Sequence, residues 1–215
     1  VVQYHSSDMV LHTDSDAAYL VAPKARSRVA GYHYLSSKST KPGPPSPDDP
    51  PPPNNGPIDV LCNVMREVMA SASEAELCAL FRNGKAACPI RATLEELGHP
   101  QPPTVLVTDN TTAAGIANDS VKQKRSKAID MRFYWIRDCV RIGQLYVHCG
   151  AEVSPTRPTF FTKNDPAAHH RAIRSTYLYS TRPLILPGIN LIVSTTTAMT
   201  DIPRPPLLLD LRSCW

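Results

Sequence analysis

Residues 104–141 read TVLVTDNTTAAGIANDSVKQKRSKAIDMRFYWIRDCVR, and this stretch decides the predicted fold. It opens with a short apolar run, Val-Leu-Val, which stops at Asp109-Asn110, and a segment rich in lysine and arginine follows. An apolar run of this length that ends in turn-forming residues is typical of a buried strand. The pattern predicts a strand over 104–108 with one carboxylate, Asp109, at its end, followed by a basic helical segment.

Two helices and a further strand are expected after Asp109. A short helix is predicted over 111–117 and a longer one over 126–141. Gly143 is expected to end the second helix, and 145–148, Leu-Tyr-Val-His, has the composition of a strand. The apolar residues that share one face of the longer helix are Ile129, Phe133, Ile136 and Val140.

Three strands without intervening helical pattern are predicted before the first helix. They cover 9–13, 29–35 and 58–64, and the first is expected to end at Asp16, in the run Asp-Ser-Asp. Parallel neighbours need a long crossover connection, whereas strands joined by turns pair antiparallel. The sequence therefore predicts an antiparallel meander of three strands at the start of the sheet.

A proline-rich insert, 38–57, separates the second and third strands. Nine of the chain's 22 prolines lie within 42–57. Consecutive prolines lack amide donors and favour an extended conformation, so this insert is predicted to be an exposed, disordered loop. A second irregular region is expected at the end of the chain, where 179–215 is predicted to be a disordered tail outside the domain 1–178.

The first helix is expected to begin near Ser73. Ser73 followed by Glu76 fits a capping box, in which the two side chains bond to each other's backbone N–H groups. Pro89 is expected either to start a second helical segment or to kink a longer helix, and Gly98 to end it. The residues at helical spacing within 73–87 are Leu77, Leu80 and Phe81.

The order of three strands, a helix, a strand, two helices and a strand predicts an α/β fold around one mixed sheet. A content of 42% hydrophobic and 20% charged residues in 215 supports a globular core. The formal net charge of +4 gives only a mild preference for polyanionic partners.

Cysteine usage and hydropathy favour an intracellular protein, in the cytoplasm or the nucleus. The six cysteines form no Cys-x-x-Cys pair and lie at no zinc-finger spacing from a histidine, so reduced thiols are expected. No apolar run approaches the roughly 20 residues that span a bilayer, so no membrane association is expected. The chain begins with Val1, which predicts a fragment of a longer product.

Three carboxylates are predicted at the ends of separate elements: Asp16 after the first strand, Glu76 in the first turn of the first helix, and Asp109 after the fourth strand. Carboxylate oxygens suit Mg²⁺, and two such ions stabilise the attacking and leaving oxygens of phosphodiester hydrolysis. Each residue also has a structural alternative. Asp16 suits a turn, Glu76 a capping box and Asp109-Asn110 a helix N-cap.

Several motifs resemble the ribonuclease H domain of copia-type retrotransposon polyproteins. The most specific is Arg-Ser-Lys-x-Ile-Asp-x-Arg at 125–132, and the resemblance covers roughly residues 9–178. It implies a ribonuclease H-like mixed sheet of five strands, three antiparallel strands first, flanked by helices. The segments that carry it are SDAAYLVAPKARSRVAGYHYL (15–35), SASEAELCAL (71–80), VTDNTTAAGIAN (107–118), KQKRSKAIDMRFYWIRD (122–138) and FTK (161–163).

The resemblance implies catalytic and metal-binding roles for Asp16, Glu76 and Asp109. The implied cofactor is a pair of Mg²⁺ ions, with Mn²⁺ as an alternative. Asp14 competes with Asp16, because residues two apart in a strand lie on the same face. Glu74 is a neighbouring carboxylate that competes with Glu76.

A fourth carboxylate that the resemblance implies is replaced in this chain. Members of the family place an aspartate three residues before the Thr-Lys pair of the last motif. The pair here is Thr162-Lys163, so the corresponding residue is Thr159, whose hydroxyl is a much poorer metal ligand than a carboxylate. Asp165 lies nearby but out of register. This loss predicts a degraded copy in which catalysis is impaired.

The resemblance implies cleavage of the RNA strand of RNA–DNA hybrids during reverse transcription. The implied partners are the hybrid and the reverse transcriptase region of the parent polyprotein. Two alternatives remain: a nucleic-acid-binding fold that has lost catalysis with Thr159, and a transposon relic that does not fold independently. The residues expected to bind hybrid phosphates, unless they form only a solvated face, are Lys122, Lys124, Arg125 and Lys127.

Overall fold

In the computed structural model the chain divides into two units, and all described residues belong to the first, Val1–Thr181. The predicted tail, 179–215, and most of the proline-rich insert lie outside the described residues, so the predicted domain division stays a prediction. The structure describes residues 2, 4–38, 53, 55–119, 130–150, 162, 166–168 and 171.

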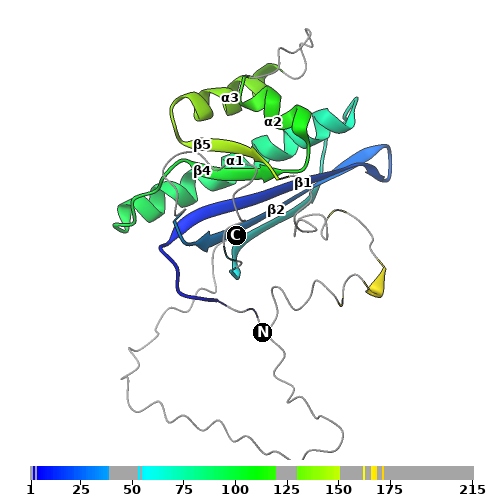
Figure 1. Cartoon of the computed structure of the whole chain (residues 1–215). Coiled ribbons are helices and arrows are strands. Elements are labelled where there is room, and N and C mark those ends of the chain that lie inside the picture. The colour runs from blue at the N-terminus through cyan, green and yellow to red at the C-terminus, as the bar shows by residue number, and fades with distance from the viewer. Residues whose placement is uncertain are drawn as a thin grey trace, which may run out of the picture. The chain divides into compact units, whose positions relative to one another are not determined.

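The described part of the chain forms one five-stranded sheet with the order β3-β2-β1-β4-β5 (Figure 1). Strand β2 pairs antiparallel with both β1 and β3, whereas β4 pairs in parallel with β1 and β5. This arrangement confirms the predicted mixed sheet of five strands with three antiparallel strands first. The strands are β1 (Val10–Ala22), β2 (Arg26–Ser36), β3 (Pro57–Val64), β4 (Thr104–Thr108) and β5 (Leu145–Cys149).

The connections between strands explain the two pairing modes. A tight turn joins β1 to β2, and its residues Lys24 and Ala25 have positive φ angles of 62° and 53°. The path from β3 to β4 instead runs through the long helix α1, which gives the chain enough length to return in parallel. The predicted meander and the long connection through α1 thus have the lengths that their pairing requires.

Strand β1 is longer than predicted. The sequence led us to expect an end at Asp14-Ser15-Asp16, but the strand continues to Ala22. Asp14 pairs with Tyr32 and Asp16 with Ala30, so backbone pairing with β2 outweighs the turn preference of these residue types. Asp16 therefore lies within β1 and not after it.

Helix α1 (Ala72–Glu96) is one continuous helix that contains Pro89. Of the two expected outcomes at Pro89, a separate second helix is wrong. Leu97 is the C-cap, and Gly98 follows with a φ of 88°, a conformation that favours glycine and that ends the helix as predicted. Helix α2 (Thr111–Ala117) has its predicted bounds. Helix α3 is described from Asp130 to Arg141, and the first residues predicted for it lie outside the described residues.

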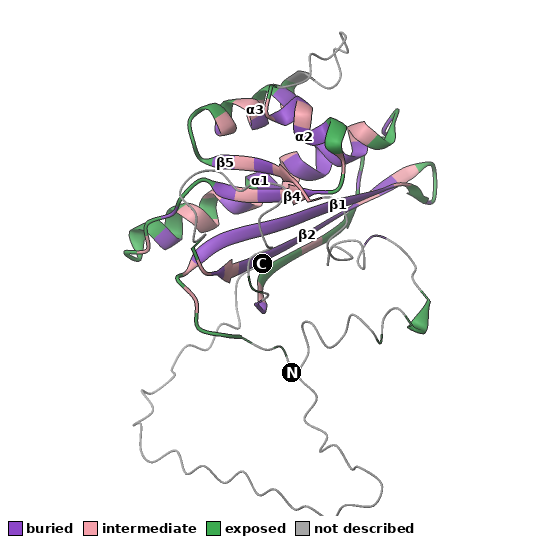
Figure 2. Cartoon of the chain, in the orientation of Figure 1, coloured by how far each residue is buried: buried purple, intermediate pink, exposed green. Residues whose placement is uncertain are grey.

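The main core lies where the three helices pack against β4 and β5 (Figure 2). Leu80 of α1, Leu106 of β4 and Ile136 of α3 are fully buried in it. Leu11 of β1 contacts α1 in a second cluster, and Ala17 of β1 does so in a third. Helix α1 is therefore fixed along the length of β1, and this contact sets the position of the first turns of α1 relative to Asp16.

Two further expectations concern the whole chain. Within the described ranges, no helix combines the length and the hydropathy needed to cross a bilayer. Among the described residues, Cys78, Cys88, Cys139 and Cys149 form no disulfide, and the expected reduced state of the thiols stays a prediction.

Candidate metal centre

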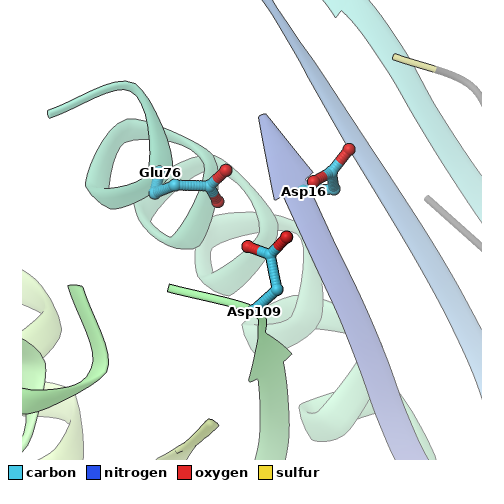
Figure 3. Close-up of side chains that lie close together, drawn as sticks. All are labelled: Asp16, Glu76 and Asp109. Carbon is cyan, nitrogen blue, oxygen red and sulfur yellow. The ribbon is translucent and has the colours of Figure 1, made fainter. Parts of the chain in front are cut away.

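The carboxylates of Asp16, Glu76 and Asp109 come together at one end of β4 (Figure 3). Each offers a ligand oxygen, and these oxygens all lie within 4.8 Å of one another. They belong to β1, α1 and the residue that follows β4, so three elements far apart in the sequence build one cluster. The structure places together the three residues that the sequence singled out, and their catalytic role stays a prediction.

Asp16 and Asp109 meet because β1 and β4 run in parallel. The pairing of these strands includes Asp14 opposite Val107, and both carboxylate residues lie two positions further along. A parallel register carries such residues forward together, so Asp16 and Asp109 reach the same level of the sheet. Strand β4 ends at Thr108, so Asp109 is the first residue beyond the strand.

Glu76 lies two residues further into α1 than predicted, because the helix begins at Ala72. The N-cap is Ser71, whose hydroxyl accepts a hydrogen bond from the Glu74 N–H at 3.1 Å. The Glu74 carboxylate in turn accepts from the Ala70 N–H at 2.7 Å. The predicted capping box of Ser73 with Glu76 is therefore wrong, because Ser71 and Glu74 cap the helix, and Glu76 is not needed as a cap.

Hydrogen bonds from β1 and β4 hold the Glu76 carboxylate, which has no capping role, in the cluster. One oxygen, Oε1, accepts a hydrogen bond from the Ala17 N–H at 3.1 Å, and Oε2 accepts a longer one from the Thr108 hydroxyl at 3.5 Å. Ala17 follows Asp16 and Thr108 precedes Asp109. The neighbours of both other carboxylates thus orient Glu76.

Asp109 is also free of a capping role. The N-cap of α2 is Asn110, whose side chain accepts a hydrogen bond from the Ala113 N–H at 2.9 Å. Asp109 is exposed, and it lies near Cys149 at the end of β5. Burial, together with the negative charge of Asp109, raises the pKa of the Cys149 thiol above its ordinary value.

The cluster suits a divalent cation by its charge and by its donor atoms. Asp16 is 1% exposed and Glu76 is 6% exposed, so two carboxylates are buried beside a third. Buried carboxylates close together repel each other and lose hydration, a cost that a cation offsets. All three ligands are hard oxygen donors, the type that Mg²⁺ and Mn²⁺ prefer.

Thr162 is a site residue that sequence reasoning missed. Its side chain is 2% exposed, and its hydroxyl donates a hydrogen bond to Oδ2 of Asp16. The motif Phe-Thr-Lys at 161–163 was a signal, but it directed attention to Thr159, three residues earlier. Thr159 and Asp165 lie outside the described residues. Among the described carboxylates, Asp14 and Glu74 do not belong to the cluster.

The predicted phosphate-binding residues Lys122, Lys124, Arg125 and Lys127 lie outside the described residues. Three arginines of α3 that are described form ion pairs within the protein. Arg132 bonds to Glu67 at 2.6 Å, Arg137 pairs with Asp119, and Arg141 pairs with Asp138. These three residues therefore have a structural role on the surface of the helix.

One curated protein is similar to part of this chain. No protein-family model matches the chain. It is 32% identical over 87 residues to the retrovirus-related Pol polyprotein of transposon TNT 1-94 from Nicotiana tabacum, a match that covers 40% of this chain and 7% of that protein. Over this stretch the chain is similar to part of a retrotransposon Pol polyprotein. It thus spans a small part of the length of the curated relative that it matches.

Solved structures with similar folds include several ribonucleases H. The LC11 ribonuclease H1 isolated from compost is 11% identical, with a TM-score of 0.49, over 71% of this chain and 92% of its own. A second structure of LC11 ribonuclease H1, in complex with an RNA/DNA hybrid, is 10% identical with a TM-score of 0.43, over 64% and 83% of the two chains. The PFV ribonuclease H domain is 18% identical with a TM-score of 0.42, over 74% and 90%.

Proposed function

We propose that this retrotransposon ribonuclease H-like domain is a metal-dependent nuclease that hydrolyses the RNA strand of RNA–DNA hybrids during reverse transcription. The observation that carries the proposal is the approach of the Asp16, Glu76 and Asp109 ligand oxygens to within 4.8 Å. The match to a Pol polyprotein supports the biological setting, and the copia-type motifs of the sequence support the type of element.

Asp16, Glu76 and Asp109 are the residues that would hold the metal, with Mg²⁺ as the expected ion and Mn²⁺ as the alternative. When bound by these carboxylates, Mg²⁺ would supply a nucleophilic water and would stabilise the leaving oxygen of the scissile phosphodiester. Hard oxygen ligands from three elements can surround an ion, which one helix or one strand cannot do. The donor set of this chain therefore fits the proposed cofactor.

The three carboxylates of the site differ in burial: two are buried and one is exposed. Asp16 and Glu76 are buried and hydrogen-bonded, so their oxygens are held in place before any ligand arrives. Asp109 is exposed, so its carboxylate is accessible to an incoming phosphate group and its metal ion. Preorganised charge of this kind stabilises a transition state without paying for reorganisation during the reaction.

We infer that basic residues before α3 recognise the hybrid. Lys122, Lys124, Arg125 and Lys127 would contact phosphates of the hybrid, and 2′-hydroxyl contacts would distinguish RNA from DNA. The reverse transcriptase region of the parent polyprotein would deliver the hybrid, in the cytoplasm or the nucleus. Binding of this type follows the backbone and is largely independent of base sequence.

The test compares four labelled duplexes of one sequence: an RNA–DNA hybrid with the label on its RNA strand, the same hybrid labelled on its DNA strand, double-stranded RNA and double-stranded DNA. With Mg²⁺, cleavage is expected only in the RNA strand of the hybrid, and EDTA should abolish it. Equal cleavage of double-stranded RNA would contradict the assigned substrate class.

The presence of Thr159 in place of the family's aspartate favours a second function, binding of hybrids without cleavage. In that case the hybrid would bind in a fluorescence anisotropy titration, while none of the four duplexes would be cut. A relic that does not fold would differ from both, because its circular dichroism would show no cooperative melting transition.

A further inference from the structure

The contact between Thr162 and Asp16 joins two residues that are 146 positions apart. Both side chains are almost completely buried, at 2% and 1% exposure. A hydroxyl group in the protein interior needs a hydrogen-bond partner, and any acceptor would satisfy that need. Here the acceptor is a carboxylate of the proposed metal centre, so the contact acts on the chemistry of the site as well as on the fold.

A carboxylate has two oxygens, and the Thr162 hydroxyl engages one of them, Oδ2. A hydrogen bond to one oxygen stabilises the charged form and fixes the torsion angle of the side chain. The second oxygen, Oδ1, is then held in one direction. The fixed group would present a single oxygen to a cation instead of rotating between alternative positions.

The other buried carboxylate of the cluster is restrained by a comparable set of donors. Glu76 accepts hydrogen bonds from the Ala17 N–H and from the Thr108 hydroxyl. Each buried member of the cluster therefore has a threonine hydroxyl on one of its oxygens, whereas Asp109 is exposed. Partners that orient metal ligands in this way commonly change metal affinity by roughly 10–100-fold when they are removed.

We propose that Thr162 is a positioning residue for Asp16, because its hydroxyl holds Oδ2 and so fixes the orientation in which the carboxylate meets the cation. This inference rests on the proposed function, because it assigns Asp16 to the metal centre. It explains why a threonine from the last motif contributes to the site although its hydroxyl is a poor metal ligand. Thr162 acts through Asp16 and does not touch the substrate.

The test measures binding of Mn²⁺ alone to the full chain, by the electron paramagnetic resonance signal of the free ion. Thr162→Val keeps the shape of the side chain and removes the hydroxyl, and it is expected to weaken Mn²⁺ binding by about tenfold or more. Thr162→Ser keeps the hydroxyl and should bind within about threefold of the unchanged protein. Rescue by serine separates the role of the hydroxyl from the role of the packing.

Thr13→Val is the matched control. Thr13 is also fully buried, and its hydroxyl bonds to His33 Nδ1 at 2.9 Å, away from the carboxylate cluster. This variant should lower the free energy of unfolding and leave Mn²⁺ affinity unchanged. If Thr162→Val does not fold, Thr162→Ala takes its place, and the comparison with Thr162→Ser stays the same.

The outcomes separate this inference from the proposed function. Mn²⁺ affinity of Thr162→Val equal to that of the unchanged protein would overturn the positioning role and leave hybrid cleavage untouched. Mn²⁺ binding that depends on the Thr162 hydroxyl, in a chain that cuts no hybrid, would support the positioning role and contradict the nuclease. No Mn²⁺ binding by the unchanged chain would contradict both.

Discussion

Asp16 and Asp109 lie side by side because the parallel pairing of β1 with β4, with Asp14 opposite Val107, carries both residues to the same level of the sheet. The Glu76 carboxylate completes the cluster, and the backbone N–H that follows Asp16 holds it there. The site is thus a consequence of strand register and of the position of one helix. Changes that alter either should alter metal binding.

Removing one charge from the cluster should stabilise the metal-free protein. In Glu76→Gln the amide oxygen can still accept from the Ala17 N–H, while one of three neighbouring negative charges is lost. We expect a gain of about 1 kcal/mol in the free energy of unfolding in EDTA, because the repulsion falls. Urea denaturation followed by circular dichroism measures it.

The same variant should no longer respond to metal. At a Mn²⁺ concentration ten times the dissociation constant, the unchanged protein should gain about 1.4 kcal/mol, and Glu76→Gln almost nothing. Glu74→Gln is the matched control, because Glu74 caps the helix and lies outside the cluster. A full metal response in Glu76→Gln would show that Glu76 is not a ligand.

A residue larger than glycine at position 31 is expected to lower the free energy of unfolding, because it would collide with Asn83. A Cβ atom at position 31 would lie 1.8 Å from Asn83 Oδ1. The Asn83 amide donates to the Ser15 hydroxyl and to the Ala30 carbonyl, so it cannot move without breaking these bonds. Gly31→Ala should therefore cost about 1–3 kcal/mol in the free energy of unfolding.

A double-mutant cycle checks this cause. Asn83→Ala removes the atom that Gly31→Ala would meet, so the double variant should lose less stability than the sum of the two single losses. Additive losses, measured by urea denaturation, would mean that another contact limits position 31.

The protein should lose stability in mild acid through His33. Burial lowers the pKa of His33 below its ordinary value, and the opposing effects of Asp59 and Asn83 are smaller. The unfolded chain then binds a proton at a higher pH than the folded chain does. The free energy of unfolding should fall below about pH 6.5, by at most about 1.4 kcal/mol per pH unit from this residue. Above that pH, His33 contributes no pH dependence.

Chemical denaturation at a series of pH values tests the effect of His33. His5→Gln serves as the control for the exchange of a histidine for glutamine at an exposed position. A His33→Gln variant with the pH profile of the unchanged protein would remove His33 as the source.

The cysteines should differ strongly in reactivity. Cys62 is exposed on the edge strand β3, whereas burial, together with neighbouring Cys88, raises the pKa of Cys139 to about 11. Among the described cysteines, iodoacetamide at pH 8 should modify Cys139 only after unfolding, because its thiol is buried and little of it is the reactive thiolate, whereas the exposed Cys62 should react in the folded protein. Mass spectrometry of digested samples reads the order directly, and early modification of Cys139 would contradict the packing of α3.

The sequence predicted the order of the elements well, because apolar periodicity reports which residues are buried. It failed at two points close to the site. The run Asp-Ser-Asp resembles a strand end, yet pairing with β2 continues the strand through it. Residues 71–76, Ser-Ala-Ser-Glu-Ala-Glu, contain two overlapping capping boxes, and local sequence cannot choose between them. Packing of α1 along β1 makes that choice.

The candidate site was predictable in part for a similar reason. Asp16, Glu76 and Asp109 occur in recognisable motifs, so the sequence could place them together through the family resemblance. The Thr162 contact depends on the return of the chain to β1 after 146 residues, and no local pattern encodes such a contact. Long-range register and chain return are properties of the fold, and only the structure gives them.

The most direct test of the central claim is the initial rate of Mg²⁺-dependent cleavage of an RNA–DNA hybrid by the unchanged chain and by Asp109→Asn. Asp109 is exposed and caps no helix, so the substitution should leave the fold intact. We predict cleavage by the unchanged chain and a loss of roughly 100-fold or more in the variant, as expected when a group that stabilises the transition state is removed. Equal, background-level signals from both proteins would contradict the nuclease function.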